Sequence, residues 1–170
     1  MASKLVQIAT TTLTGSTASV ILTGINTDDV YLFTWSGVTC SNDVDTNQIR
    51  VTKSGTAQSD AEYDWASEQY FASTSYVNNA VTNQTQWFDL YQGTQTGESQ
   101  NGLMYLYSFN DSGENSFVSR EQISLSYVPQ LQGLISVGAH TVASASDGIE
   151  YKMSVGTLMS GTFTLFKVVS

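Results

Sequence analysis

Few residues in this sequence belong to the types that enzymes use as nucleophiles or bases. Cys40 is the only cysteine and His140 the only histidine, and no Gly-x-Ser-x-Gly motif is present that could position a serine. A nucleophilic cysteine or serine needs a base within hydrogen-bond reach, and Cys40 and His140 lie about 100 positions apart. We therefore predict that Cys40 is a small residue beside a strand, that His140 has no catalytic duty, and that the protein is not an enzyme.

The best candidate for a metal site is the stretch "SNDVDTNQ". Asp43, Asp45 and Asn47 place oxygen ligands at alternate positions, as at the start of a calcium-binding loop. Counted from Asp43, however, the sixth position is Gln48 where such a loop has glycine, and the twelfth is Ser54 where it has glutamate. Zinc would need several cysteine or histidine ligands. We therefore favour a chain without a metal ion or other cofactor, with a calcium ion near Asp43 and Asp45 as the alternative.

Two sets of side chains could contact a sugar. One is an acidic cluster that consists of Asp60, Glu62, Asp64 and Glu68. It could supply the carboxylate pair of a glycoside hydrolase, although spacing along the chain does not set the separation of the carboxylates. The other consists of the three tryptophans, Trp35, Trp65 and Trp87. They could form an aromatic surface that faces a glycan or another subunit, or they could lie in the core.

Charge and composition exclude two classes of partner. The net charge is −9, and the six basic residues are scattered along the chain: Lys4, Arg50, Lys53, Arg120, Lys152 and Lys167. Nucleic-acid binding needs clustered lysine or arginine to neutralise phosphates, so we predict no nucleic-acid partner. No apolar run approaches the roughly 20 residues of a membrane helix, so we also predict no membrane partner. No apolar run near the start resembles a signal peptide. A single cysteine also fits synthesis in a reducing cytosol.

These side chains must be positioned by β-strands. Short apolar runs rich in valine, isoleucine, threonine and aromatic residues alternate with turn residues, which is typical of an all-β domain. We count about eleven such segments: residues 4–9, 18–25, 29–38, 47–55, 61–71, 85–93, 102–110, 116–128, 133–140, 148–155 and 161–169. Residues 59–71 could instead form a helix capped at Ser59 or Asp60, but no helical period is sustained elsewhere, and we favour a strand.

The strand pattern predicts one domain over residues 1–170, because no linker or internal repeat interrupts it. No alternation of strands with helices indicates a parallel sheet. We predict an all-β fold, an antiparallel β-sandwich of the jelly-roll or a related Greek-key type. In the last segment, Phe163 and Leu165 occupy one alternation set and Phe166 and Val168 the other. This pattern predicts an interior strand that is covered on both faces.

Two stretches resemble a family of small phage virion proteins that have a jelly-roll-like β-domain and are labelled tail fibre or decoration protein. They are "ASVILTGINTDDVYLFTWSGV" near the start and "SDGIEYKMSVGTLMSGTFTLFKVV" near the end. The shared layout is an early strand, Gly-Ile, an aromatic strand and a final Ser-Gly-Thr strand. The chain departs from the family in the middle, where "IRVTKSGTAQSD" replaces an Arg-Phe-Asn-Gly-Asp motif, and at Leu165, Phe166 and Lys167, which replace Leu-Tyr-Gly.

The resemblance implies a virion structural protein made in the host cytoplasm. We expect a head decoration (cement) protein that stabilises the capsid, because predicted strands near residue 5 and residue 169 leave no adaptor or shaft within this sequence. The alternative is a short tail-fibre or spike subunit that binds a host surface glycan. The expected partners are further copies of the chain, as a homotrimer, and the major capsid protein. Only 12% of residues are charged, and such a surface suits packing against neighbours.

Overall fold

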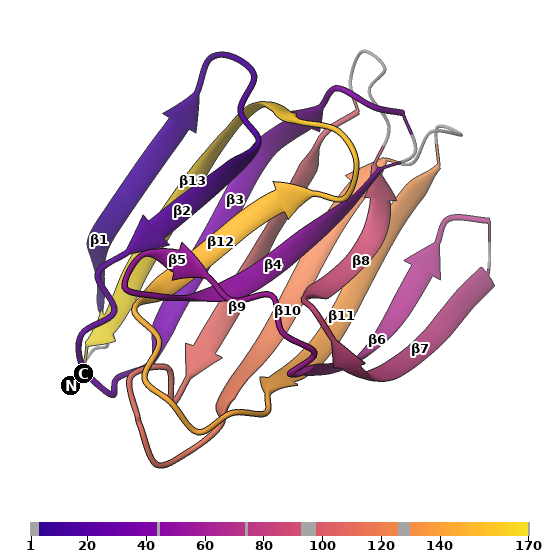
Figure 1. The fold of residues 1–170 in the computed structure, drawn as a ribbon. Helices are drawn as coiled ribbons and strands as arrows, with labels where there is room; N and C mark the ends of the chain where they lie inside the picture. Colours follow the sequence, from indigo (N-terminus) through magenta and orange to yellow (C-terminus); the bar gives the residue numbers. More distant parts are fainter. Residues whose placement is uncertain (1–3, 44, 74, 93–97, 126–129, 170) are drawn as a thin grey trace.

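The computed structural model describes residues 4–43, 45–73, 75–92, 98–125 and 130–169, and these residues form β-strands and no helix (Figure 1). The strands are β1 (Lys4–Leu13), β2 (Ser19–Thr23), β3 (Tyr31–Cys40), β4 (Asp45–Lys53), β5 (Thr56–Ala57), β6 (Tyr63–Phe71), β7 (Ser75–Gln84), β8 (Trp87–Gln92), β9 (Gln100–Tyr107), β10 (Ser116–Leu125), β11 (Leu131–His140), β12 (Gly148–Met153) and β13 (Leu158–Val169). Within the described ranges, no helix has the length and hydrophobicity needed to cross a membrane.

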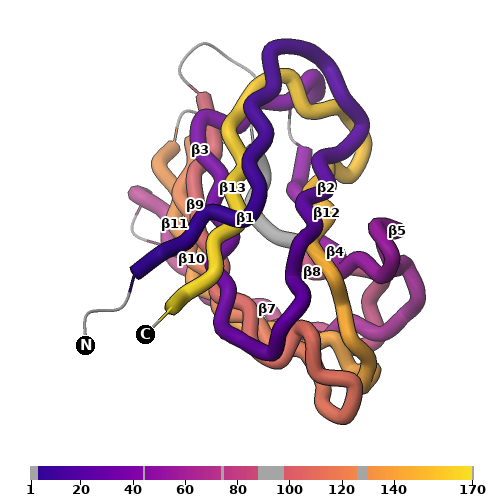
Figure 2. Tube along the Cα trace, turned by 90° about the vertical axis from the view of Figure 1, so that its left-hand side faces the viewer, coloured from indigo at the N-terminus to yellow at the C-terminus, as the bar shows by residue number. Residues whose placement is uncertain are grey.

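Two antiparallel sheets pack face to face. The larger sheet has eight strands in the order β1-β13-β3-β9-β10-β11-β6-β7, and the smaller sheet has the order β2-β12-β4-β5, with β8 also paired to β4. Figure 2 shows the sheets as two layers, with β2, β12 and β4 on one side and β3, β9 and β10 on the other. The predicted all-β antiparallel sandwich is confirmed. In the larger sheet, the three strands β9, β10 and β11 lie between β3 and β6.

All eleven segments expected from the sequence contain strands. The contested segment 59–71 contains strand β6 and no helix, and β6 pairs with β11 on one side and β7 on the other, so the strand prediction is confirmed. Strand β7 and the two-residue strand β5 are additional. The sequence of β7, "SYVNNAVTNQ", contains three asparagines, which are disfavoured in strands, and it forms a strand here through pairing with β6.

The closing segment occupies an interior position in the larger sheet. Strand β13 pairs with β1 on one side and with β3 on the other. Phe163 and Leu165 are fully buried between the sheets, as predicted. The expectation that both faces are covered is wrong, because Phe166 and Val168 on the opposite alternation set are only partly buried. That set lies on the side of the larger sheet that the smaller sheet does not cover.

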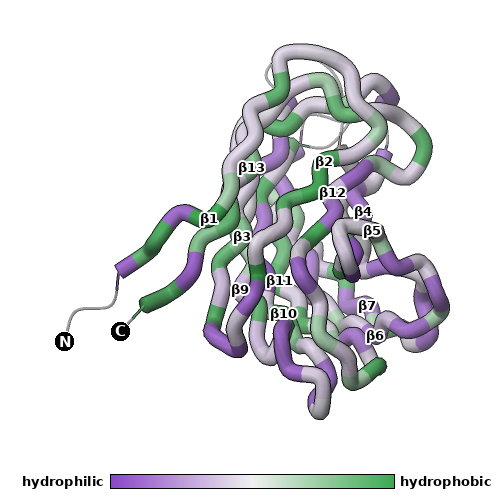
Figure 3. The backbone as a smooth tube through the Cα atoms, turned by 60° about the vertical axis from the view of Figure 1, so that its left-hand side comes forward, coloured by the Kyte–Doolittle hydropathy of each residue, from purple (hydrophilic) through white to green (hydrophobic). Residues whose placement is uncertain are grey.

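One hydrophobic core fills the space between the sheets, and aromatic rings make up much of it. Phe33, Trp35, Tyr151 and Phe163 form one group of ring contacts, with centroids 5.1–6.5 Å apart. Tyr63, Trp87 and Phe109 form another, with centroids 5.0 Å and 6.4 Å apart. Figure 3 shows hydrophobic and hydrophilic residues interleaved along the strands, the pattern expected when a strand has one face toward a core.

Candidate functional site

The most unusual feature of the molecule is the distribution of polar and apolar side chains on β10 and β11. The alternate residues of β10 that point between the sheets include Arg120, Gln122 and Ser124, all at most 5% exposed. Phe117 and Ile123, on the opposite set, are 47% and 48% exposed. An antiparallel sheet with one solvated face ordinarily has the reverse arrangement, with apolar residues toward the core.

Strand β11 repeats this inversion. Its inward-pointing residues include Gln132 and Ser136, which are buried, whereas Leu131, Ile135 and Val137 are 49–56% exposed. We call the side of the larger sheet that is turned away from the smaller sheet the outer face. Its large exposed side chains come from strands β6, β7, β9, β10 and β11: Tyr70, Tyr76, Tyr105, Tyr107, Phe117, Ile123, Leu131, Ile135 and Val137.

Two hydrogen bonds between polar side chains connect the sheets. The Asn47 side-chain amide on β4 donates a hydrogen bond of 3.1 Å to the Gln122 side-chain oxygen on β10. The Tyr151 hydroxyl on β12 donates to the Gln100 side-chain oxygen on β9. Burial raises the pKa of Tyr151, so this hydroxyl keeps its proton and acts as a donor. The sheets are thus joined by specific polar contacts at this end of the sandwich, while apolar side chains lie on the outer face.

Strand register arranges the outer face in rows across the sheet. One row runs Tyr107, Phe117, Ala139 and Asp64, as directly paired residues of β9, β10, β11 and β6. The next row runs Tyr105, Ser119, Val137, Ala66 and Ala80. The rings of Tyr105 and Tyr107 are stacked with centroids 6.4 Å apart. Large and small side chains therefore alternate over the face and leave hollows above the small ones.

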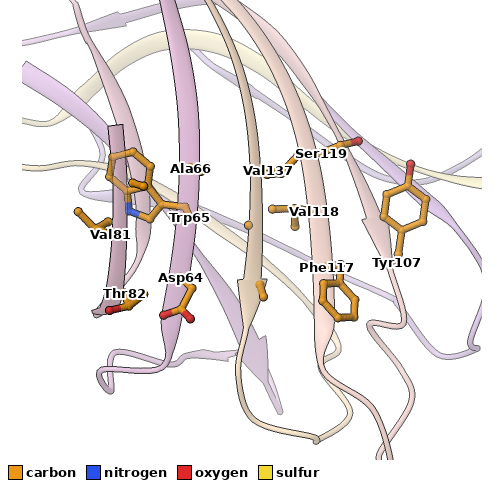
Figure 4. Close-up of a pocket in the computed structure, with 13 residues that line it drawn as sticks. Asp64, Trp65, Ala66, Val81, Thr82, Tyr107, Phe117, Val118, Ser119 and Val137 are labelled. Atoms are coloured by element: carbon orange, nitrogen blue, oxygen red, sulfur yellow. The ribbon is translucent and has the colours of Figure 1, made fainter. Parts of the chain in front are cut away.

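The largest of the three hollows described on the outer face has a volume of about 740 Å³ and is lined by five strands, β6, β7, β9, β10 and β11. In Figure 4, Tyr107 and Phe117 lie on one side, Asp64 and Thr82 on the other, and Val137 between them. Ala66, Ala80, Ser119 and Ala139 also line the hollow, and their small side chains account for its depth. The surface is shallow and apolar, which suits contact with a broad surface more than enclosure of a small molecule.

Two further hollows continue the same face. One, of about 610 Å³, is lined by Tyr70, Leu103, Ile123 and Ile135 above the small residue Gly133. The other, of about 490 Å³, adjoins both, because it shares Ala66, Ala80 and Val137 with the largest hollow and Ile135 with the second. The outer face is therefore one extended, uneven apolar surface.

The charges described on the outer face are negative. Asp64, Glu68 and Glu121 line its hollows, and none of the lining residues is lysine or arginine. The Tyr70 hydroxyl donates a hydrogen bond of 2.9 Å to Glu68, which favours the protonated phenol and raises the pKa of Tyr70. Asp64 accepts a hydrogen bond from the backbone N–H of Asn83. The surface thus offers apolar contacts together with hydrogen-bond acceptors.

The three tryptophans do not form an exposed aromatic surface. Trp35 and Trp87 are at most 3% exposed and Trp65 is 8% exposed, and all three belong to the core cluster. Their rings supply buried area, and glycine residues make room for two of them. An added Cβ atom at Gly102 would lie 2.3 Å from Trp35, and one at Gly138 would lie 2.6 Å from Trp87. The exposed aromatic residues are instead tyrosines and a phenylalanine on the outer face.

Asp45, one of the two expected calcium ligands, binds backbone instead. Its Oδ1 accepts hydrogen bonds from the N–H groups of Thr46, Ser154 and Val155 and from the Ser154 hydroxyl, and its Oδ2 accepts one of 2.7 Å from Gly156 N–H. This buried carboxylate therefore holds the loop between β12 and β13, and Asp43 is exposed. Among the described residues, no three acidic, cysteine or histidine side chains form a group that could hold a metal ion.

Cys40 and His140 occupy separate buried sites. Burial and the nearby Asp45 raise the pKa of Cys40 to about 11, so its thiol is protonated at neutral pH. His140 packs against Tyr63, with ring centroids 4.9 Å apart, and its Nε2 lies 3.2 Å from Glu62 Oε2. Desolvation lowers the pKa of His140, with Lys53 adding to the effect and Glu62 opposing it.

The acidic cluster around Trp65 is divided between different surroundings. Glu62 faces His140, whereas Asp64 and Glu68 line hollows of the outer face. Asp64 and Glu68 lie four residues apart on one strand, which places their Cα atoms about 13 Å apart. The carboxyl groups of glycoside hydrolases lie about 5 to 9.5 Å apart. The described geometry therefore gives no direct support to a glycosidase pair.

No protein-family model matches the chain, and no curated protein sequence matches it.

Sequence reasoning missed the outer face because it assigned neither side-chain set of residues 116–125 to the core. The signal was present in "SFVSREQISL", where one set reads Ser, Val, Arg, Gln, Ser and the other Phe, Ser, Glu, Ile, Leu. Arg120 and Gln122 are polar, so the composition of the first set indicates a solvent-facing set. The structure instead buries both side chains. The assignment of a set to the core depends on which other strands cover it.

Proposed function

We propose that this protein is a structural subunit of a larger protein assembly, and specifically a virion structural protein of the head-decoration type. The outer face of the larger sheet is the surface that contacts the assembly, and the major capsid protein is its partner. In this role the subunit strengthens the particle by binding across the joints between neighbouring capsid subunits.

The observation that carries the proposal is the inversion on β10 and β11. Exposed Phe117, Ile123, Ile135 and Val137 face away from the core while Arg120 lies inside it. Monomeric soluble proteins rarely expose contiguous apolar patches of more than a few hundred Å², and larger patches usually mark binding surfaces. Burying such side chains against a partner contributes about 25 cal/mol for each Å² of apolar surface removed from water.

The shape and composition of the face support a protein partner. The three hollows adjoin one another over strands β6, β9, β10 and β11, which gives a broad surface with knobs and depressions rather than one enclosed pocket. A standard interface buries about 800 Å² per partner and therefore needs a broad surface of this kind. The exposed tyrosines can bury their rings and still hydrogen-bond through their hydroxyl groups.

A second candidate is a short tail-fibre or spike subunit that binds a host surface glycan. The stacked pair Tyr105 and Tyr107 supports it, because aromatic faces beside hydrogen-bond acceptors such as Asp64 and Glu121 are a common arrangement in sugar-binding sites. Under this alternative, Tyr107→Ala abolishes glycan binding, and the chain is present at only a few copies per particle.

The copy number in purified virions of the phage that carries the gene tests the proposal. A decoration protein is expected in hundreds of copies per particle, measured by gel densitometry against the major capsid band. A few copies per particle would support the fibre or spike, and absence from purified virions would contradict both.

A binding experiment tests the surface itself. Particles that lack the chain are mixed with added protein, and the bound fraction is measured after sedimentation. Val137→Lys places a charge in the centre of the outer face and is expected to lower binding at least tenfold. The matched control is Val155→Lys in the loop between β12 and β13, where the valine is 80% exposed and lines none of the three hollows. Equal binding of the two variants would exclude the outer face as the contact.

A further inference from the structure

Strand β7 is an open edge of the larger sheet. It pairs with β6 and is the last strand in the sheet order, so the backbone groups on its other side have no neighbouring strand among the described residues. In Figure 1, β7 lies at the end of the sandwich, beyond β8. Tyr76 and Val77 on this edge are 67% and 44% exposed.

The features that usually protect an edge strand are scarce in β7. Proteins protect such edges with charged residues, prolines, bulges or short strand lengths. β7 has ten residues and contains no charged residue and no proline. Its one register irregularity lies near the end of the strand, beside Asn83, and leaves Ser75–Val81 in regular pairing with β6. A segment of this kind accepts an extended strand through backbone hydrogen bonds.

The opposite edge, β1, is protected. It carries Lys4 and has a register shift between Gln7 and Ala9. The side chain of Ile8, within that shift, approaches Gly24 at the end of β2, so β1 turns toward the smaller sheet. The two edges therefore differ in their capacity to accept a further strand, and β7 is the available one.

We propose that β7 pairs antiparallel with β7 of a second copy of this chain about a two-fold axis. Charge favours a second copy at this edge: each chain carries a net charge of −9, yet all ten residues of β7 are neutral. On the outer face the same two chains would instead bring carboxylates together. The two larger sheets then join into one sheet whose outer faces form a single surface.

The sequence of β7 selects one register. Pairing centred on Asn79 places Val77 opposite Val81 and Tyr76 opposite Thr82, with the outer faces on the same side. Asn79 then lies opposite its own copy, where one amide can donate to the other. Moving the centre by one residue to Asn78 or Ala80 would place Val77 opposite Asn79 or Asn83, an apolar residue against an amide. The register centred on Asn79 therefore gives the best match between facing side chains.

The first test is the mass of the isolated chain by light scattering at micromolar concentration. The self-paired edge predicts twice the chain mass of 18.4 kDa. Asn79→Asp places like charges directly opposite each other and is expected to halve the mass while the far-UV circular dichroism spectrum stays unchanged. Asn101→Asp on β9 is the matched control and keeps the dimer mass, because a carboxylate can still accept the Gly37 N–H that the Asn101 Oδ1 accepts now.

The second test fixes the register by disulfide formation. Asn79→Cys is expected to form a covalent dimer on mild oxidation, because both copies of residue 79 lie at the axis. Tyr76→Cys is expected not to cross-link, since the two copies of residue 76 lie six residues apart along the pair, about 20 Å. Cys40 does not compete, because it is buried.

Several outcomes overturn the inference: a monomeric wild-type chain, the three-subunit mass that the family resemblance implied, a dimer that Asn79→Asp leaves intact, or cross-linking through residue 76 and not residue 79. The inference does not rest on the proposed function. A monomeric Asn79→Asp protein that still binds particles supports the decoration role, whereas a wild-type dimer absent from virions leaves the β7 contact standing and removes that role.

Discussion

The indole ring of Trp87, on the smaller sheet, lies against the backbone of Gly138 on the larger sheet. A Cβ atom at position 138 would come within 2.6 Å of the Trp87 Nε1 and 2.8 Å of its Cδ1. The same Nε1–H donates a hydrogen bond of 3.2 Å to the carbonyl oxygen of the next residue, Ala139. The close approach of the sheets at this point therefore depends on the absence of a side chain.

Gly138→Ala tests this contact. The added methyl group forces the Trp87 ring or strand β11 to move, and such overpacking is expected to lower the free energy of unfolding by about 1–3 kcal/mol. Urea denaturation measures the change. Gly133→Ala on the same strand is the control, since its added Cβ would meet its nearest neighbour at 3.9 Å, and a change of under about 0.5 kcal/mol is expected there. Equal losses in both variants would mean that the ring contact is unimportant.

Asp45→Asn tests the loop between β12 and β13. The carboxylate accepts hydrogen bonds from Ser154, Val155 and Gly156, and an amide group would turn one donor toward the Gly156 N–H. Because hydrogen bonds to a buried charged acceptor are strong, we expect a loss of about 2–3 kcal/mol in the free energy of unfolding.

The exposed neighbour supplies the control for this variant, as Asp43→Asn should leave stability unchanged. Treatment of the wild-type protein with EDTA should also leave the melting temperature unchanged, because the Asp45 oxygens are occupied by backbone donors. A fall of several degrees on chelation would instead restore the calcium interpretation of Asp43 and Asp45.

His140 makes stability depend on pH. Burial and Lys53 lower the pKa of this histidine in the folded protein, although Glu62 at 3.2 Å partly opposes the shift. The unfolded chain therefore takes up a proton first, at a pKa of about 6.5. The free energy of unfolding is then expected to fall as the pH drops from about 7 through 6.5 toward the lower folded-state pKa.

Variants at the two partners check the sign of this dependence. His140→Gln should flatten the decline in stability between about pH 7 and pH 5.5, measured by urea denaturation at each pH. Glu62→Gln should steepen it, because the carboxylate that favours the protonated imidazole is gone. If the wild-type protein became more stable on acidification across this range, the ion pair with Glu62 would outweigh burial.

Leu165 tests the interior position of the closing strand. Its side chain is fully buried, and β13 is hydrogen-bonded to β1 and β3. Leu165→Asp places a carboxylate among apolar groups, which is expected to cost several kcal/mol out of a typical stability of about 5–15 kcal/mol. Met159→Asp, at a position 40% exposed on the same strand, is the control and should fold normally.

Deletion of residues 160–169 extends this test. It removes Phe163 as well and leaves β1 and β3 without the strand between them, so the product is expected not to fold. Far-UV circular dichroism and sedimentation report the outcome. A folded, monomeric truncated chain would show that β13 acts as a clasp between subunits and not as part of the core.

Strand positions were predictable from local sequence because the side-chain pattern and turn residues of each strand are local properties. The eleven expected segments include the contested residues 59–71, where Tyr63 and Trp65 share an alternation set and now point into the core. Strand β7 was not predictable in this way, since its asparagines disfavour a strand. β7 forms a strand because it pairs with β6, the strand that precedes it in the chain.

The candidate site was less accessible to sequence reasoning than the fold. The tryptophans attracted attention as the largest aromatic residues, but Trp35 and Trp87 are buried over glycines that lie far from them in the sequence. Asp45 was singled out by its spacing from Asp43, and its actual partners lie about 110 residues away. Each assignment depends on a contact between distant segments, which one-dimensional spacing does not encode.

The amino-acid sequence by itself determined the class of fold, the approximate strands, and the alternation that divides each strand into two sets of side chains. Only the tertiary structure decided which set faces the core. On β10, Arg120 and Gln122 point inward and Phe117 and Ile123 outward. The physical reason is that alternation is a property of one strand, whereas burial is a property of the layers that cover it. Here the smaller sheet covers the side that carries Arg120, and the apolar side is left as a surface.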